Sequence, residues 1–136
     1  MTVRLNHSDY EAIVAHARAG LPNEACGLIA GKIDNDIKTI AKVYMLSNPD
    51  NSPEHFSIDP KEQLAAVKDM RSLALVPLGN FHSHPSTPAR LSEEDIRLAY
   101  DPTASYLILS LAEEQPVLKA FGVKNGEGVP QALEIV

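Results

Sequence analysis

Two histidines separated by one residue, His82 and His84, are the side chains in this sequence best spaced to bind a metal ion. On a β-strand they would point to the same face, with Cα atoms roughly 6.5–7 Å apart, so both imidazoles could reach one ion. Pro85 follows at once and is expected to end the strand. The pair would then lie at the end of a sheet, where active sites of α/β proteins are often found.

A carboxylate that could complete the ligand set is Asp95, three residues after Ser92 at a predicted helix start. That spacing places both side chains on one helical face. Two neutral histidines and one carboxylate would leave zinc a position for water, which is typical of a catalytic site. The same spacing is also typical of a capping box, in which the serine caps the helix and the acid reaches back to the backbone. The nearby histidines favour the metal site, with Ser92 capping through its backbone geometry and its hydroxyl facing the metal.

Hydrolysis at such a site needs a base beside the metal, because a zinc-bound water with a pKa near 7 must still transfer its proton. Of the several acids, Glu24 is the best candidate. It follows the helix-ending Leu21-Pro22 and precedes a short buried strand, so its carboxylate could be carried to the sheet edge. Cys26 could be a reactive thiol, but a small buried hydrophobic residue is the commoner role.

The elements that must position these residues alternate between helical and strand periods, which predicts a mixed α/β fold. Strands are expected at Ala25–Ala30, Ile37–Leu46, His55–Ile58 (a short edge strand), Val76–Ser83 and Ser105–Leu111, with a hairpin of Val117–Val123 and Val129–Ile135 across a turn at Asn125-Gly126. Helices are expected from Ser8, as cap, to Ala19, from Asp59-Pro60 with Leu64, Val67 and Met70 on its apolar side, and from Ser92. Ser47–Pro53 could be a flap over the site or a plain surface loop.

The composition sets outer limits on function. The chain has 136 residues, with 44% hydrophobic and 22% charged, which predicts one domain over residues 1–136. A net charge of −6 with scattered Lys and Arg argues against nucleic acid as a partner. There is no signal-peptide pattern, no apolar run of ~20 residues and only one cysteine, so we expect no membrane association and a cytoplasmic location.

The pattern Glu24 … His82-x-His84-Pro85-(six residues)-Ser92-x-x-Asp95 resembles the JAMM (MPN+) metalloprotease motif at every defining position. The segments PNEACGLIAG and SYLILSL resemble the small bacterial stand-alone members, and the resemblance covers nearly the whole chain. It implies a cytidine-deaminase-like α/β fold, a mixed β-sheet flanked by helices. It also implies that zinc is bound by His82, His84 and Asp95, that Glu24 is the general acid/base, and that Ser92 helps to hold the oxyanion.

The resemblance implies a zinc metallopeptidase that hydrolyses amide or isopeptide bonds. The leading substrate is a ubiquitin-like sulfur-carrier protein, from which a C-terminal adduct such as cysteine is removed after Gly-Gly. Two alternatives stay open: a non-catalytic MPN-type scaffold, whose members lack the metal ligands, and a metallopeptidase acting on small peptides or cell-wall stems. The oligomeric state is undecided, with a homodimer among the options.

Other polar residues near the motif have less definite roles. Ser83 should point to the face opposite the two histidines. Asn80, Ser86 and Thr87 are candidates to support the ligands or to contact substrate, and nothing in the sequence chooses among them. The remaining histidines, His7, His16 and His55, have no ligand spacing, and no function is predicted for them.

Overall fold

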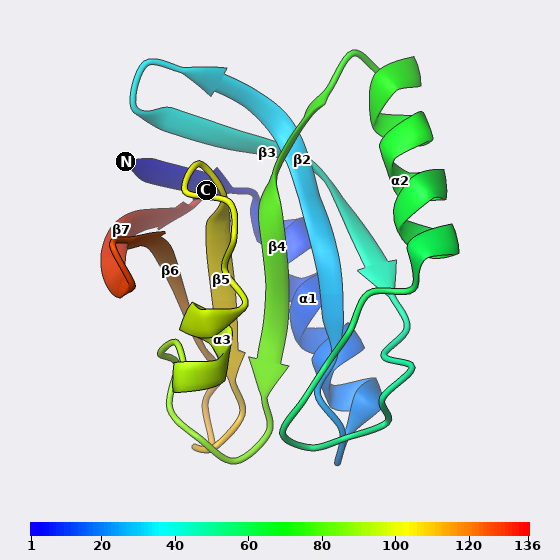
Figure 1. Ribbon diagram of the computed structural model, residues 1–136, viewed down its shortest axis with the longest axis vertical. Helices are drawn as coiled ribbons and strands as arrows, with labels where there is room; N and C mark the ends of the chain where they lie inside the picture. The colour runs from blue at the N-terminus through cyan, green and yellow to red at the C-terminus, as the bar shows by residue number, and fades with distance from the viewer.

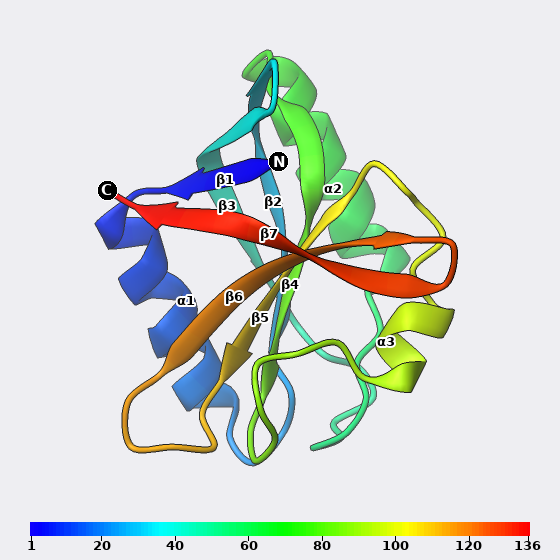
Figure 2. The ribbon, with the colours of Figure 1, turned by 90° about the vertical axis from the view of Figure 1, so that its left-hand side faces the viewer.

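The computed structural model describes all residues from 1 to 136 as a strongly twisted mixed sheet with helices packed against it. The seven strands close into a barrel in the order β1-β3-β2-β4-β5-β6-β7 (Figures 1 and 2). The pairs β1–β3, β1–β7 and β4–β5 are parallel, and the other pairs are antiparallel. The predicted mixed α/β class is confirmed. The strands are β1 (Thr2–Leu5), β2 (Cys26–Asp34), β3 (Ile37–Leu46), β4 (Val76–His84), β5 (Ser105–Ser110), β6 (Val117–Lys124) and β7 (Glu127–Ile135), and the helices are α1 (His7–Gly20), α2 (Pro60–Ser72) and α3 (Glu93–Arg97).

Two hydrophobic clusters hold the helices against the strands. The larger one packs α1, through Ile13, Val14 and Ala17, against one face of the sheet. The smaller one packs α2, through Ala66 and Met70, against the outer face of β2 and β3. The prediction that Leu64 faces the core is wrong, because it lies on the opposite side of α2 and is 56% exposed.

Strand β1 was not predicted, and it closes the barrel. Its four residues pair in parallel with β3 on one side and with β7 on the other, so that the two ends of the chain lie side by side (Figure 2). The alternation of Thr2, Val3, Arg4 and Leu5, with Val3 and Leu5 buried, is a local strand signal, but it is only four residues long, and both partner strands come from distant positions.

Two further predictions are corrected by side-chain hydrogen bonds. Helix α1 is capped by Asn6 rather than Ser8, because Asn6 Oδ1 accepts from the backbone N–H of Asp9 at 2.7 Å. Residues 55–58 do not form an edge strand. Their backbone is bound instead by the amide of Asn48, which donates to the His55 carbonyl at 2.8 Å and accepts from the Ser57 N–H at 3.3 Å.

The connection between β4 and β5 brings the ends of the functional motif together. Parallel neighbours need a crossover connection, and here that connection contains α3. The chain therefore leaves β4 at His84, turns at Pro85 and returns past the end of β4 with α3 (Figure 1). None of the three helices is both long and apolar enough to cross a bilayer.

Candidate metal centre

Strand β4 presents both histidines on its outer face. His82 is 2% exposed and His84 is 5% exposed, and their Nε2 atoms lie 3.2 Å apart. The residues that alternate with them point the other way: Phe81, before His82, is part of the core, and Ser83, between the two histidines, accepts through Oγ from the backbone N–H of Ala25 at 2.8 Å, as expected. The strand ends at His84, as predicted from Pro85.

Asp95 reaches the two histidines from the first turn of α3. Its Oδ2 lies 3.2 Å from Nε2 of His82 and 3.2 Å from Nε2 of His84. The capping box is also present, because Ser92 Oγ accepts from the Asp95 N–H at 3.0 Å and Asp95 Oδ2 accepts from the Ser92 N–H at 2.9 Å. The two interpretations of this pair are therefore compatible. The expectation that Ser92 would cap through its backbone alone is wrong, since its hydroxyl is the capping acceptor.

The spacing of these three atoms fits a metal ion. Tetrahedral ligands about 2.0–2.1 Å from a central ion are separated from one another by about 3.3–3.4 Å, close to the 3.2 Å found here. His84 Nδ1 lies 2.9 Å from the Pro88 carbonyl, which can only accept, so Nδ1 carries a proton, and in the neutral imidazole Nε2 keeps its lone pair. With both Nε2 atoms deprotonated, three electron-rich atoms converge on one point, and a cation between them would offset their repulsion. His82, His84 and Asp95 are suited to hold a metal cofactor.

The pKa shifts of Asp95 and His82 favour metal binding at neutral pH, whereas that of His84 favours a protonated imidazole, whose proton a metal ion would displace. Burial alone would raise the pKa of Asp95, but its hydrogen bonds to His82 and His84 and the Ser92 N–H hold that pKa well below the ordinary value. Burial lowers the pKa of His82, and Asp95 only partly offsets this, so His82 is neutral. Burial also acts to lower the pKa of His84, but the hydrogen bonds to Asp95 and to the Pro88 carbonyl outweigh it and raise the value.

Glu24 lies just before β2 and is buried, with 6% of its surface exposed. Burial is the main cause that raises the pKa of Glu24 to about 7, with the negative charges of Asp95, Glu94 and Glu54 adding to it and His84 opposing it. A carboxyl group with a pKa near the working pH can both accept and release a proton, as a general acid/base must.

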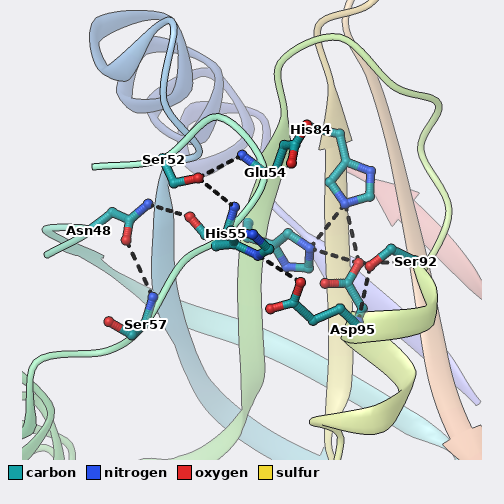
Figure 3. A network of polar contacts seen from close by, with 10 residues as sticks. Asn48, Ser52, Glu54, His55, Ser57, His84, Ser92 and Asp95 are labelled. Atoms are coloured by element: carbon teal, nitrogen blue, oxygen red, sulfur yellow. Dashed lines mark hydrogen bonds and ion pairs between the residues drawn. The ribbon is translucent and has the colours of Figure 1, made fainter. Parts of the chain in front are cut away.

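The segment from 47 to 58 closes over one side of the site (Figure 3). Its Phe56 ring stacks on the His82 imidazole, with centroids 4.6 Å apart. His55 Nδ1 lies 2.7 Å from Glu94 Oε2 on α3. The sequence assigned no role to either residue, because neither has a ligand spacing. Only the register of the loop against β4 and α3 brings them to the site.

Cys26 faces away from solvent and is not arranged as a nucleophile. It is fully buried at the start of β2, and its thiol donates weakly to the Ser47 and Ser57 carbonyls at 3.5 and 3.8 Å. Burial raises the pKa of this thiol to about 12. Since the thiolate is the reactive form, its place in the fold matches the structural role expected from the sequence.

Comparison with known proteins gives consistent similarities. A family profile described as prokaryotic homologs of the JAB domain matches residues 7–123. A CysO-cysteine peptidase from Mycobacterium tuberculosis is 32% identical over 126 residues, which cover 92% of this chain and 85% of the relative. A solved structure of a protein from Desulfitobacterium hafniense is 53% identical, with a TM-score of 0.90 and coverage of 100% of this chain and 93% of the other. A JAB1/MPN domain protein from Archaeoglobus fulgidus is 21% identical with a TM-score of 0.61, and the match covers 97% of each chain; this likeness confirms the predicted fold.

Proposed function

The chain belongs to the family of prokaryotic homologs of the JAB domain, and from this premise we propose that it is a zinc-dependent hydrolase that removes a C-terminal adduct, such as cysteine, from the Gly-Gly end of a ubiquitin-like sulfur-carrier protein. The observation that carries the proposal is the convergence of His82, His84 and Asp95 on one point, with a buried Glu24 close enough for its pKa to respond to their charges. The curated relative from M. tuberculosis is a peptidase named for a CysO-cysteine substrate.

In amide hydrolysis the residues of this chain would have three separate roles: metal binding, proton transfer and stabilisation of the oxyanion. His82, His84 and Asp95 would hold the zinc ion, which supplies Lewis acidity toward the carbonyl and the attacking water. The Glu24 carboxylate accepts a proton from the water as it attacks the carbonyl carbon. The Ser92 hydroxyl donates to the oxygen on which negative charge develops. Glu24 then delivers its proton to the leaving amine nitrogen, which regenerates the carboxylate.

A groove beside the site supports a substrate with an extended tail. It has a volume of about 440 Å³ and runs along the outer side of β4, with Asn80 in its wall. The segment after α3, which includes Leu98 and Tyr100, also lines it. The lining of the groove on β4 runs from Pro77 to Asn80, over which the strand advances roughly 10 Å, about the length of three extended residues. Tyr100, 83% exposed, borders this path and offers an apolar contact to a protein partner.

The direct test is release of cysteine from a defined carrier. Zinc-loaded protein is incubated with a sulfur carrier extended by cysteine after Gly-Gly, and intact-protein mass spectrometry follows loss of the extension. We expect full release by the wild type and none by the chelated protein. A carrier ending in Ala-Ala-Cys tests the requirement for Gly-Gly, and an isolated peptide ending in Gly-Gly-Cys tests the alternative of a small-peptide metallopeptidase. Release from the peptide but not from the folded carrier would overturn the proposed substrate.

A non-catalytic scaffold remains the second candidate, since binding a carrier would need no chemistry. The intact ligand set argues against it. Metal analysis separates the two: a scaffold would be purified with zinc far below one equivalent even after zinc loading, and it would bind the carrier without cleaving it.

The proposal also covers the number of domains, the cellular location and the oligomeric state. Residues 1–136 act as one domain, which the closed order of the seven strands supports. The single, buried cysteine is compatible with a reducing cytoplasm. A homodimer remains a prediction, and light scattering of the purified chain with and without carrier tests it.

A further inference from the structure

Two buried polar atoms next to the metal site have no hydrogen-bond partner: Nδ1 of His82 and Oδ1 of Asn80. Both residues belong to β4 and are two positions apart. Side chains at that spacing point to the same face of a strand, with Cα atoms roughly 6.5–7 Å apart. Buried polar groups are nearly always paired, so two unpaired atoms at neighbouring positions on one face require a common explanation.

The two atoms are chemically complementary once a metal ion is considered. If His82 offers Nε2 to the ion, its remaining proton must sit on Nδ1, which becomes a donor. The amide oxygen of Asn80 can only accept. Histidines that bind metals almost always donate their other ring N–H to an oxygen atom, which sets the tautomer and the ring orientation.

The other histidine ligand already has such a partner, because His84 Nδ1 binds the Pro88 carbonyl at 2.9 Å. Two other groups near His82 are unsuitable as partners for its Nδ1. The Phe56 ring stacks on the imidazole and offers no acceptor oxygen. The thiol of Cys26, opposite His82 on β2, is directed at the Ser47 and Ser57 carbonyls.

We infer that Asn80 is the positioning residue for His82: its Oδ1, unpaired in this structure, accepts the Nδ1–H of His82 in the zinc-bound protein, directly or through one bridging water, and so keeps Nε2 free for the metal ion. The inference rests on the metal site of the proposed function. Asn80 also forms part of the wall of the groove along β4. The residue that orients His82 therefore also borders the path proposed for the substrate tail.

The test measures zinc affinity by competition with a chromophoric chelator. Asn80→Leu removes the acceptor, and we expect its affinity to fall about 10–100-fold, as for other partners of metal-bound histidines. Asn80→Asp keeps an acceptor oxygen and should restore most of the affinity. Gln63→Leu is the matched control, because it removes a side-chain amide from the same groove but from α2, and we expect its zinc affinity to equal that of the wild type.

A second measurement applies to the wild type, whether or not the leucine variant folds. In the ¹H–¹⁵N spectrum of the zinc-loaded imidazoles, Hδ1 of His82 should give a downfield, slowly exchanging signal. Hδ1 of His84, which donates to the Pro88 carbonyl, is the internal reference. In Asn80→Leu the His82 signal should move upfield or be lost by exchange, while the His84 signal stays.

These measurements distinguish failure of the proposed function from failure of the role assigned to Asn80. If the wild type does not bind zinc, the proposed function is wrong. If the wild type binds zinc but Asn80→Leu binds it equally tightly, or if the wild-type spectrum shows Hδ1 of His84 and no protected Hδ1 of His82, the role of Asn80 is wrong and the metal site stands.

Discussion

The side-chain amide of Asn48 donates to the backbone carbonyl of Glu24 at 3.0 Å and to the carbonyl of His55 at 2.8 Å. The backbone N–H of Glu24 in turn donates to the carbonyl of Ser52 at 2.8 Å. Glu24 is therefore held at both its N–H and its carbonyl by a loop that also contacts His82 and α3. The position of the proposed general base depends on this loop as much as on β2.

Asn48→Ala should lower kcat while leaving zinc content unchanged, because it releases Glu24 without touching the ligands. A misplacement of about 1 Å at a catalytic group can cost ~10²-fold in rate, so we expect a loss of roughly 10–100-fold. Ser57→Ala is the control, since it removes only the hydrogen bond from Ser57 Oγ to Asp50 in the same loop. Equal kcat values for Asn48→Ala and wild type would show that the loop does not position Glu24.

Glu24→Gln should bind zinc as the wild type does and lose turnover. The amide cannot accept the proton of the attacking water, and general acid–base catalysis contributes about 10²–10⁴-fold. Metal content by mass spectrometry and single-turnover cleavage of the cysteine-extended carrier measure the two effects separately. Near-normal turnover would remove Glu24 from the mechanism.

The raised pKa of Glu24, about 7, also predicts a stability effect in the metal-free protein. The folded state binds the Glu24 proton more tightly than the unfolded state does, so the free energy of unfolding should fall as pH rises from about 4.5 to 7. Glu24→Gln removes this dependence. It should be more stable than the wild type by about 1–3 kcal/mol above pH 7, with no such gain below pH 4.5. Urea unfolding with a chelator at pH 4, 6 and 8 measures the difference, and a constant difference at all three pH values would contradict the assignment.

Two substitutions of Ser92 separate its structural and catalytic contributions. Ser92→Ala removes the cap of α3 and should cost about 1 kcal/mol in the free energy of unfolding. It also removes the hydroxyl proposed to stabilise the oxyanion, a loss of about 10²–10³-fold in kcat. Ser92→Asn retains a capping acceptor, so we expect near wild-type stability with the same loss of kcat. If Ser92→Asn kept full activity, the hydroxyl would have only its capping role.

Asp95→Asn should abolish tight zinc binding without dismantling α3, because the amide oxygen still accepts from the Ser92 N–H while the ligand charge is lost; Asp95→Ala should lose both. The thermal transition of the wild type should rise when zinc is added, and that of Asp95→Asn should not. Glu94→Gln is the neighbouring control, since Glu94 pairs with His55 rather than with the metal ligands. Zinc-dependent stabilisation of Asp95→Asn equal to the wild type would exclude Asp95 as a ligand.

Local sequence patterns predicted the elements whose cause is local. The alternation around His82 and His84, the cap and proline at Asp59-Pro60, and the turn at Asn125-Gly126 all act within a few residues, and the structure has β4, α2 and the β6–β7 hairpin at these places. Predictions were less reliable where a short segment is compatible with two local structures. Asn6 and Ser8 are both good caps, and the structure uses Asn6. The segment 55–58 has strand-like residues, but the Asn48 side chain takes its backbone hydrogen bonds.

The sequence by itself predicted the candidate metal ligands His82, His84 and Asp95 and their spacing, because they lie, with Ser92, within one strand–turn–helix segment whose geometry follows from period and capping. Only the tertiary structure decided that Glu24, 58 residues before His82, is buried beside them with a raised pKa. It also decided that the loop from 47 to 58 would join Glu24 to α3, and that β1 would close the barrel. Burial, desolvation and parallel strand pairing depend on contacts between distant segments, and a local pattern carries no information about which distant segments will meet.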